Sequence, residues 1–489
     1  MCTPSRKNGV RHPKLLFIHQ NFVTPHQAGN CSRPAITIAT LLSRGWTVDV
    51  ITTQFGYLND STAEKMPDYV IEKEGDLTIH RLRVDSGGSQ LWKRGRFYMD
   101  FLLKAFLYMH KFKDVDIIFT ASPPILQIFA SMLFSVWHNK PMMLEVHDLW
   151  PARLVDNKLL TSSAVIVMME WLEALMYHYA DHLIPISPTY RPYLMRMGIP
   201  SKKISVIPTG GSQTYVLNKA NYGKRWRNKH SLQGKFLLLY AGSFNESYEL
   251  KVIIDAAYDI ARIDPNIQWI FAGNGRQRHI IEEASQELHT IHYIGCIPSN
   301  ELMQVYLSAD VGLNTFVRNP QNEINIPGKL FDYLAAGLPV ISLINGLSGV
   351  ILSAAKAGFV LKHCSKDDMV SAVLKLKRMP QKKRQLLGKS GQRWVLKNMN
   401  DIALWHEAWP IFVAVNGRRT YVPRFLRFTS SAITAWKDTT RRRSRKSIRQ
   451  LFTEDRQYNI ESTLNDWLRK HSTSSSTPMK VTRPKLLSV

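Results

Sequence analysis

The feature that most constrains the fold is an alternation of short apolar runs with longer helical patterns, which occurs twice along the chain. The apolar runs are nearly continuous, as expected of strands buried on both faces of a parallel sheet. The first series ends near Thr209 and the second begins at Phe236. The sequence therefore predicts two tandem, Rossmann-like, doubly wound α/β domains. Ligands of such sheets bind beyond the carboxyl ends of the strands, so we expect a site in the interdomain cleft.

The same pattern sets the expected domain boundaries. Strands are expected at 14–19, 46–53, 78–84, 116–122, 142–148, 182–187 and 204–209, and again at 236–242, 267–273, 292–295, 310–315 and 359–362. Residues 218–234 are polar, basic and aperiodic, and this predicts a linker. The expected organisation is an extension (1–13), a first domain (14–212), a linker (213–234), a second domain (235–390), C-terminal helices (391–415) and a basic tail (416–489).

The net charge of +26 over 489 residues indicates an anionic partner, which is nucleic acid, a membrane surface or a phosphorylated substrate. The charge is uneven, because residues 416–489 contain 17 Lys and Arg against 5 Asp and Glu, a net charge of +12. Residues 441–449 form a cationic run, and the Ser/Thr tract 471–478 is expected to be disordered. The folded part has no recognised nucleic-acid module, so we expect no specific nucleic-acid partner.

The four cysteines form no CxxC and no obvious pairing, which fits a reducing, cytoplasmic compartment without disulfides or structural zinc. The apolar run after the basic N-terminus is too short for a signal peptide. The most apolar region, 117–137, is interrupted by polar residues and is typical of a buried strand and helix rather than a membrane span.

One stretch, 326–341, predicts a loop, a helix, a tight turn and a strand. Pro327 can begin a helix, Gly337 can end it in a left-handed conformation, and Pro339 prevents its continuation. The amides from Gly328 to Leu330 would form an anion site at the helix start, with Lys329 as a cation and Asp332 one turn on for ribose hydroxyls. An ordinary core helix with a surface lysine fits the same pattern.

Other candidate residues follow expected strands. Gly29 lies in the loop after the first strand, where it can let backbone approach a substrate or simply form a turn. His147 and Asp148 end another strand and can bind hydroxyls or move a proton. Gly242, Asn274 and Arg276 end the first two strands of the second domain; Arg276 can meet a phosphate or begin a solvated helix. No GxxxxGKS, GxSxG, HExxH or EF-hand spacing is present.

Taken in order, eight motifs resemble the retaining nucleotide-sugar glycosyltransferases of the GT-B fold, family 4. The nearest resemblance is to the L-fucosamine transferase-like enzymes of bacterial O-antigen, capsule and exopolysaccharide assembly. The motifs extend from about Leu15 to Trp409. They are SPP (122–124), EVHDLWP (145–151), LEALMYHYADHLIPISP (172–188), GIPSKKISVIPTG (198–210), LYAGS (239–243), FAGNGR (271–276), LSADVGL (307–313) and IPGKLFDYLAAGLPVIS (326–342).

The resemblance implies an acceptor-binding first domain, a second domain that binds a UDP- or GDP-linked sugar, and final helices that cross back to the first domain. It places Asp332 at the ribose, Gly328 and Lys329 at the diphosphate, and Gly29 beside the donor phosphates. It places His147 and Asp148 at the donor sugar. It implies retention of configuration, no metal and no cofactor, with cations and a helix dipole stabilising the leaving diphosphate.

The sequence departs from the family pattern at three places. The first acid of the family's E-x7-E falls on Ile324, with Glu323 one place off as the candidate substitute. Ser243, Glu246 and Glu249 occupy the loop where the family has basic residues, and Thr209–Ser212 replaces a usual N-G-V-D. We therefore expect a hexosyl or N-acetylhexosaminyl transferase acting on a lipid-linked or growing polysaccharide, with its basic tail on the inner face of an anionic membrane. The alternative is a catalytically weak scaffold in a polysaccharide assembly complex.

Overall fold

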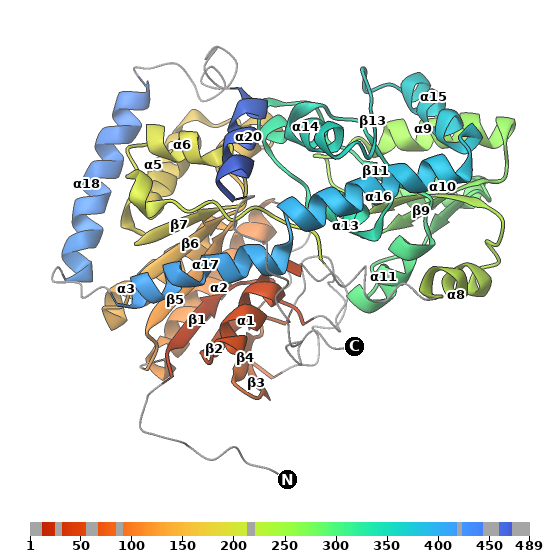
Figure 1. Cartoon of the computed structure of the whole chain (residues 1–489). Coiled ribbons are helices and arrows are strands. Elements are labelled where there is room, and N and C mark those ends of the chain that lie inside the picture. Colours follow the sequence, from red (N-terminus) through yellow and green to blue (C-terminus); the bar gives the residue numbers. More distant parts are fainter. Residues whose placement is uncertain are drawn as a thin grey trace, which may run out of the picture.

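A computed structural model of the chain describes residues 12–24, 32–54, 67–84, 91–112, 114–212, 221–417, 423–443 and 459–471. It contains two sheets with helices on both faces, as the sequence predicts (Figure 1). Strands of the first sheet lie in the order β3 (Tyr69–Glu74), β4 (Leu77–Leu82), β2 (Thr47–Thr53), β1 (Lys14–Ile18), β5 (Ile117–Ser122), β6 (Met142–Val146) and β7 (His182–Pro185). All neighbours pair in parallel except β3 and β4.

The second sheet is parallel throughout. Its order is β10 (Ile291–Tyr293), β9 (Ile267–Ala272), β8 (Phe236–Ala241), β11 (Val311–Asn314), β12 (Val340–Ser342) and β13 (Gly358–Val360).

Alternate residues of the central strands enter different apolar clusters, which explains the nearly continuous apolar runs. In β1, Leu15 and Phe17 face α1 (Ser32–Ser43) and α17 (Asp401–Asn416), whereas Leu16 and Ile18 enter the opposite cluster. The helices that contribute to that opposite cluster are α2 (Leu91–Tyr108), α3 (Ile125–His138), α5 (Ser163–Tyr179), α6 (Tyr190–Arg196) and α18 (Arg424–Arg443).

The second sheet is covered in the same way. One face carries α9 (Leu250–Ile263), α10 (Arg278–Glu287) and α15 (Lys366–Arg378). The other face carries α8 (Tyr222–Lys229), α11 (Ser299–Ser308), α13 (Gly328–Ala336), α14 (Gly346–Ala355) and α16 (Gln381–Asn398). Its apolar cluster continues into the first domain, because α17 packs there beside α1. The remaining helical segments are α4 (Ala152–Asp156), α12 (Pro320–Ile324), α20 (Ile460–His471), and the 3-10 turns η1 (Met109–Lys111) and η2 (Ser201–Lys203).

The structure differs from the expected chain segments at four places. The aperiodic linker contains helix α8, which packs on α11 through Gly223 and Trp226. The strand expected at 204–209 is a single bridge between Leu183 and Ile204, and the edge strand β3 was not expected. The basic tail includes a helix that was not expected, α18, which packs on α5 and α3 (Figure 1).

Helix α18 is fixed mainly by polar contacts. The guanidinium groups of Arg424 and Arg427 both bind the buried carboxylate of Asp181, just before β7. His178 contacts Asp438 over 2.7 Å, and Trp171 donates to the carbonyl of Ala432 over 3.3 Å. Residues 472–478 of the Ser/Thr tract lie outside the described residues. Among the described helices, none is at once long enough and apolar enough to cross a bilayer.

Candidate donor and catalytic site

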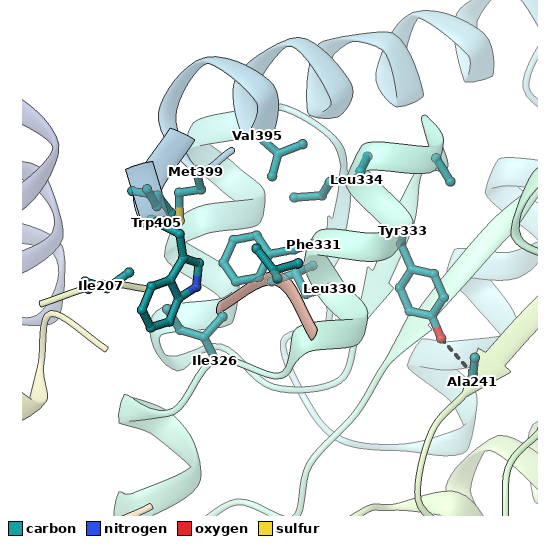
Figure 2. Close-up of a cluster of buried hydrophobic side chains, with 14 of the residues drawn as sticks. Ile207, Ala241, Ile326, Leu330, Phe331, Tyr333, Leu334, Val395, Met399 and Trp405 are labelled. Carbon is teal, nitrogen blue, oxygen red and sulfur yellow. Dashed lines mark hydrogen bonds between the residues drawn. The ribbon is translucent and has the colours of Figure 1, made fainter. Parts of the chain in front are cut away.

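Helix α13 forms as the sequence predicts, with Pro327 before its first residue and Gly337 ending it at φ 76°. Its buried face holds Leu330 and Phe331 against the junction of α16 and α17, where Trp405 lies (Figure 2). On the other side of the helix, the Tyr333 hydroxyl accepts a hydrogen bond from the amide of Ala241 over 2.9 Å (Figure 2). The start of α13 is thereby fixed relative to the carboxyl end of β8.

The first turn of α13 presents fewer amides than expected. The Leu330 amide donates to the Pro327 carbonyl over 3.1 Å, and the Leu330 side chain is fully buried. The Leu330 amide thus already has an acceptor within its own turn, and the predicted donor contact at Leu330 stays a prediction. The amides of Gly328 and Lys329 remain at the helix start, where amides have no acceptor within their own helix. Gly328 is exposed and Asp332 is partly exposed.

Lys329 is buried rather than a surface lysine. Its side chain is only 8% exposed, and its ammonium donates to the Tyr240 hydroxyl over 2.7 Å. The ammonium also lies over the rings of Tyr240 and Tyr248, 4.0 and 3.8 Å from their centroids, where cation–π attraction offsets part of its desolvation. Within the part of the chain that the structure describes, no carboxylate pairs with it. Burial lowers the pKa of Lys329 well below its ordinary value.

Glycines at the ends of β8 and β9 make room for this lysine and for each other. A Cβ on Gly242 would lie 2.9 Å from Nζ of Lys329, and one on Gly273 would lie 1.8 Å from the Gly242 carbonyl oxygen. Both have φ near 150°, which side-chain-bearing residues rarely adopt. Just after these glycines, the two loops are joined by a hydrogen bond from the Phe244 amide to the Asn274 carbonyl over 2.9 Å. Gly242, Asn274 and Lys329 are thus brought to one edge of the second sheet.

Arg276 pairs with a residue that the sequence marked as unfavourable. Its guanidinium meets the Glu246 carboxylate at two points, 3.0 Å from Nε to Oε1 and 3.1 Å from Nη2 to Oε2. The pair compensates the charge of Glu246 beside the strand-end glycines. Because both side chains are partly exposed, the pair contributes at most about 1 kcal/mol to stability. Glu249 directly precedes α9, and burial raises its pKa.

The first domain contributes a buried ionic network that was not predicted. Nε of Arg33 donates to Glu145 over 2.6 Å, and its two terminal nitrogens donate to the carbonyls of Pro208 and Ile207. The second carboxylate oxygen of Glu145 lies 2.6 Å from Nε2 of His147. Burial alone would raise the pKa of Glu145, but the charges of Arg33 and His147 outweigh burial and lower it to about 2. The network therefore fixes the orientation of His147.

His19 lies beside this network, one residue beyond β1. Its Nδ1 is buried without a hydrogen-bond partner among the described residues. Burial and the nearby His147 lower the pKa of His19 to about 4, although Glu145 acts in the opposite direction. His19 is therefore neutral at neutral pH.

The lowered pKa of His19 predicts a pH dependence. The unfolded chain takes up the proton first, so the stability contributed by neutral His19 is present above pH 6.5 and is lost as pH falls toward 4. We expect a His19→Asn variant to lose less stability than the wild type over this interval, by up to about 3 kcal/mol. Denaturant unfolding of both proteins across the interval measures the difference. Asp401, whose pKa burial raises to about 6, acts in the opposite direction but is common to both proteins. Parallel pH profiles would contradict this assignment.

The two domains meet at α12. The Ile324 carbonyl accepts hydrogen bonds from Ser187 and Thr189 over 3.0 and 2.8 Å, and its side chain enters the apolar cluster of the first domain. Asn319 donates to Asn157 over 3.0 Å. The position of the family's first acid is thus used for interdomain packing in this chain. The adjacent Glu323 is exposed, with its backbone against Gly346.

Asp148 takes part in the same interface. Its carboxylate binds Arg153 and accepts from Asn325 over 3.2 Å. These contacts hold Asp148 as a bridge between the domains. His147 and Asp148 therefore lie on the first-domain side of the interface, while Gly29 lies outside the described residues.

Sequence reasoning missed Arg33, Glu145, Tyr240 and Tyr248. Glu145 and His147 stand two residues apart at a strand end, so their side chains share a side, and this spacing was the available signal. The two tyrosines gave no comparable signal, because they meet Lys329 only in the fold. The structure describes no group of three His, Cys, Asp or Glu side chains arranged to hold a metal.

Comparisons with known proteins bear on the whole arrangement. Residues 37–210 match the glycosyl transferase 4-like domain, and residues 224–394 match the group 1 glycosyl transferases. Spore coat protein SA of Bacillus subtilis is 21% identical over 194 residues, covering 37% of this chain and 50% of that protein. WcaL of Salmonella typhimurium, a glycosyltransferase assigned to colanic acid biosynthesis, is 24% identical over 191 residues, covering 38% of this chain and 45% of that protein. The chain thus spans about half the length of these curated relatives.

Solved structures share the fold over most of the chain. Sucrose-phosphate synthase from Thermosynechococcus elongatus superposes with a TM-score of 0.64 at 18% identity, covering 83% of this chain and 99% of that one. HepE of Anabaena, solved with UDP and glucose, gives a TM-score of 0.60 at 12% identity, covering 82% of this chain and all of that one. Identities this low establish the fold alone. With both domain matches in sequence order on two doubly wound sheets, the chain belongs to the GT-B glycosyltransferases.

Proposed function

We propose that this protein transfers a sugar, with retention of configuration, from a UDP- or GDP-linked donor to a lipid-linked or growing polysaccharide. The single observation that carries the proposal is Lys329, a buried lysine without a carboxylate partner in the described residues, in the first turn of α13. A buried ammonium is costly unless an anion compensates it. A diphosphate at the amides of Gly328 and Lys329 would supply that anion.

The remaining donor contacts follow from the same geometry. Asp332 lies one turn beyond Gly328 and is partly exposed, which suits it to the ribose hydroxyls. Gly242 borders Lys329 and Asn274 follows the neighbouring strand β9, so both would lie against the phosphates at the carboxyl ends of the strands. Arg276 would reach them only by exchanging its bond with Glu246. UDP bound to HepE, a protein of the same fold, supports a nucleoside diphosphate as ligand.

The proposed reaction is front-face substitution without a protein nucleophile. The bond from the anomeric carbon to the diphosphate breaks, and a bond to the acceptor oxygen forms on the same face. The acceptor proton passes to the departing diphosphate oxygen, and Lys329 with the dipole of α13 stabilises the negative charge there without a metal. His147, held by Glu145, would bind a donor-sugar hydroxyl. Asp148 would act by positioning the interface, and Glu323 would contact the sugar only after α12 moves.

The proposed setting is polysaccharide assembly at the cytoplasmic side of a membrane. Assignment of WcaL to colanic acid biosynthesis supports a polysaccharide acceptor. The net charge of +12 in residues 416–489 supports contact with an anionic membrane, where a lipid-linked acceptor would be found.

A second candidate is a scaffold with a weakened donor site. The burial of Ile324 where the family has an acid, and the Arg276–Glu246 pair, favour it. Nucleotide binding separates the two candidates.

The test is a metal-free thermal-shift titration with UDP, GDP, ADP and dTDP, comparing the wild type with Asp332→Ala. A ligand that binds only the folded state adds about 2.7 kcal/mol of stability at a hundredfold excess over its Kd. We expect one nucleotide to raise the wild-type melting temperature and to lose this effect in Asp332→Ala. If none of the four does so, the donor proposal fails and the scaffold takes its place.

A further inference from the structure

Helix α2 is apolar on two sides. Phe101, Leu102 and Ala105 are buried toward the first sheet. A second stripe with helical spacing faces away from it: Met99, Leu103, Phe106 and Leu107 are between 44% and 67% exposed. These four large apolar side chains are spaced at i, i+4, i+7 and i+8, so they form a continuous stripe on one side of the helix. Contiguous exposed apolar surface of this kind is unfavourable in water and marks an interaction site.

Helix α18 repeats this pattern. Its inward stripe is Arg424, Ser431, Ala435 and Thr439, all buried. Its outward side carries Phe425, Leu426, Ile433 and Trp436, which are between 54% and 62% exposed. The larger apolar groups of this helix therefore point to the surface, while small and polar groups make its contact with the domain.

Helix α3 connects the two exposed stripes. It contacts both α2 and α18, and its last turn carries Trp137, 66% exposed. The Trp137 ring meets that of Phe106 edge-on, with centroids 6.5 Å apart. The Arg424 amide donates to Asn139, directly after α3, over 3.3 Å. The exposed residues thus belong to one helical layer, and we name its surface the α2–α3–α18 face, defined by Leu103, Phe106, Leu107, Trp137, Phe425 and Trp436.

Exposed positive charge accompanies this face. On α18 the side chain of Lys437 is exposed, whereas the acid of that helix, Asp438, bonds to His178, and Arg424 and Arg427 bind Asp181. Helix α18 also lies in the segment 416–489, whose net charge is +12. The acid of α2 in the described side chains, Asp100, pairs with Lys104 over 3.0 Å. An occupant that is apolar at its centre and negatively charged around it would complement these residues. A second copy would bring two like-charged surfaces together, which is unfavourable.

We propose that the α2–α3–α18 face lies on an anionic lipid bilayer, with its aromatic side chains at headgroup level. Tryptophan and phenylalanine suit this depth because their rings are apolar and flat, and cations beside them meet lipid phosphates. This proposal rests on the proposed function for the role of the contact: a lipid-linked acceptor would lie in the same bilayer as the face. The proposed contact includes the first described helix of the basic tail, since α18 is part of the layer.

The test is sedimentation of the full-length chain with vesicles of phosphatidylcholine alone or mixed with phosphatidylglycerol. A triple variant, Phe106→Ser, Trp137→Ser and Trp436→Ser, is compared with a control, Ile263→Ser and Leu386→Ser, whose apolar side chains are equally exposed outside this face. Substitutions are preferred to removal of residues after 415, because removal would also uncover Asp181.

We expect the wild type and the control to bind the anionic vesicles, and the triple variant to bind at least about tenfold more weakly. Equal binding by the triple variant, no binding by the wild type, or a dimer in solution that the triple variant abolishes would overturn the proposal. Nucleotide titration of the same proteins distinguishes this proposal from the donor-site proposal. If the protein binds vesicles but no nucleotide raises its melting temperature, the membrane face is supported and the donor site is refuted. If a nucleotide raises the melting temperature but the protein does not bind vesicles, only the membrane face is refuted.

Discussion

Replacing Arg33 with methionine is expected to lower the free energy of unfolding by about 3 to 5 kcal/mol. The guanidinium is buried and supplies hydrogen bonds to Glu145 and to two carbonyls. Its loss leaves a carboxylate inside the first domain that, among the described residues, keeps His147 as its charged partner. An uncompensated buried charge costs more than the net value of the pair. Denaturant unfolding followed by circular dichroism measures the loss.

Two controls separate the ionic effect from the change in side-chain shape. Arg262→Met removes an arginine that is 81% exposed and is expected to change stability by less than about 1 kcal/mol. The double variant Arg33→Met with Glu145→Gln has no unpaired buried carboxylate, so it should recover part of the lost free energy of unfolding.

The low pKa of Glu145, about 2, adds a pH dependence to this prediction. Stability from its ionised form is present above its ordinary pKa of 4.5 and is lost as pH falls toward 2, so the deficit of Arg33→Met should shrink there. If Arg33→Met alone were as stable as the wild type at neutral pH, the stabilising role of the Arg33–Glu145 pair would be refuted.

Replacing Lys329 with methionine is expected to weaken nucleoside-diphosphate binding about 100-fold, which corresponds to about 2.7 kcal/mol, without lowering the stability of the unliganded protein. Methionine can fill the space between Tyr240 and Tyr248, and it removes a buried ammonium whose desolvation is unfavourable. A structural lysine would give the opposite pattern, with stability lost and binding kept.

Isothermal titration calorimetry with the nucleotide selected by the thermal-shift screen measures this affinity. Lys251→Met is the matched control, because Lys251 lies on α9 with a side chain that is 76% exposed. We expect the control to bind as the wild type does. If Lys329→Met bound the nucleotide with an affinity within about twofold of the wild type, the proposed contact between Lys329 and the diphosphate would be refuted.

The sequence predicted those parts of the fold whose cause is local. Consecutive apolar residues in β1 predicted burial on both faces, and Leu15 and Leu16 indeed enter opposite clusters. Helix α13 could be placed because Pro327 and Gly337 act through their own backbone preferences. Glycines at the ends of β8 and β9 were also visible as strand-end residues.

The sequence did not predict features that depend on long-range pairing. Arg33 and Glu145 are 112 residues apart, and Lys329 and Tyr240 are 89 apart, so no spacing connects them. Helix α18 was missed for a related reason. Its buried stripe contains arginine, serine and threonine, which give no apolar periodicity, and its partner Asp181 is 243 residues away from Arg424. Helix α8 is similarly polar and packs by the close approach of Gly223 to Leu307.

Ile324 illustrates where a family pattern and a particular structure separate. The pattern expects an acid at this position, but here the residue joins α12 to the first domain through its carbonyl and its side chain. Under the proposed function, donor binding in this chain would therefore depend more heavily on Lys329 and Asp332. Both stand on α13, whose start is fixed by the packing of Phe331 and by the bond from Ala241 to Tyr333.

The most direct test of this account is a crystal structure of the protein with the nucleoside diphosphate selected by the titration. We predict the diphosphate at the amides of Gly328 and Lys329, the ammonium of Lys329 within hydrogen-bonding distance of a phosphate oxygen, and the ribose hydroxyls on Asp332. A nucleotide bound elsewhere, with Lys329 still donating to Tyr240 alone, would contradict the assignment of α13 as the donor site.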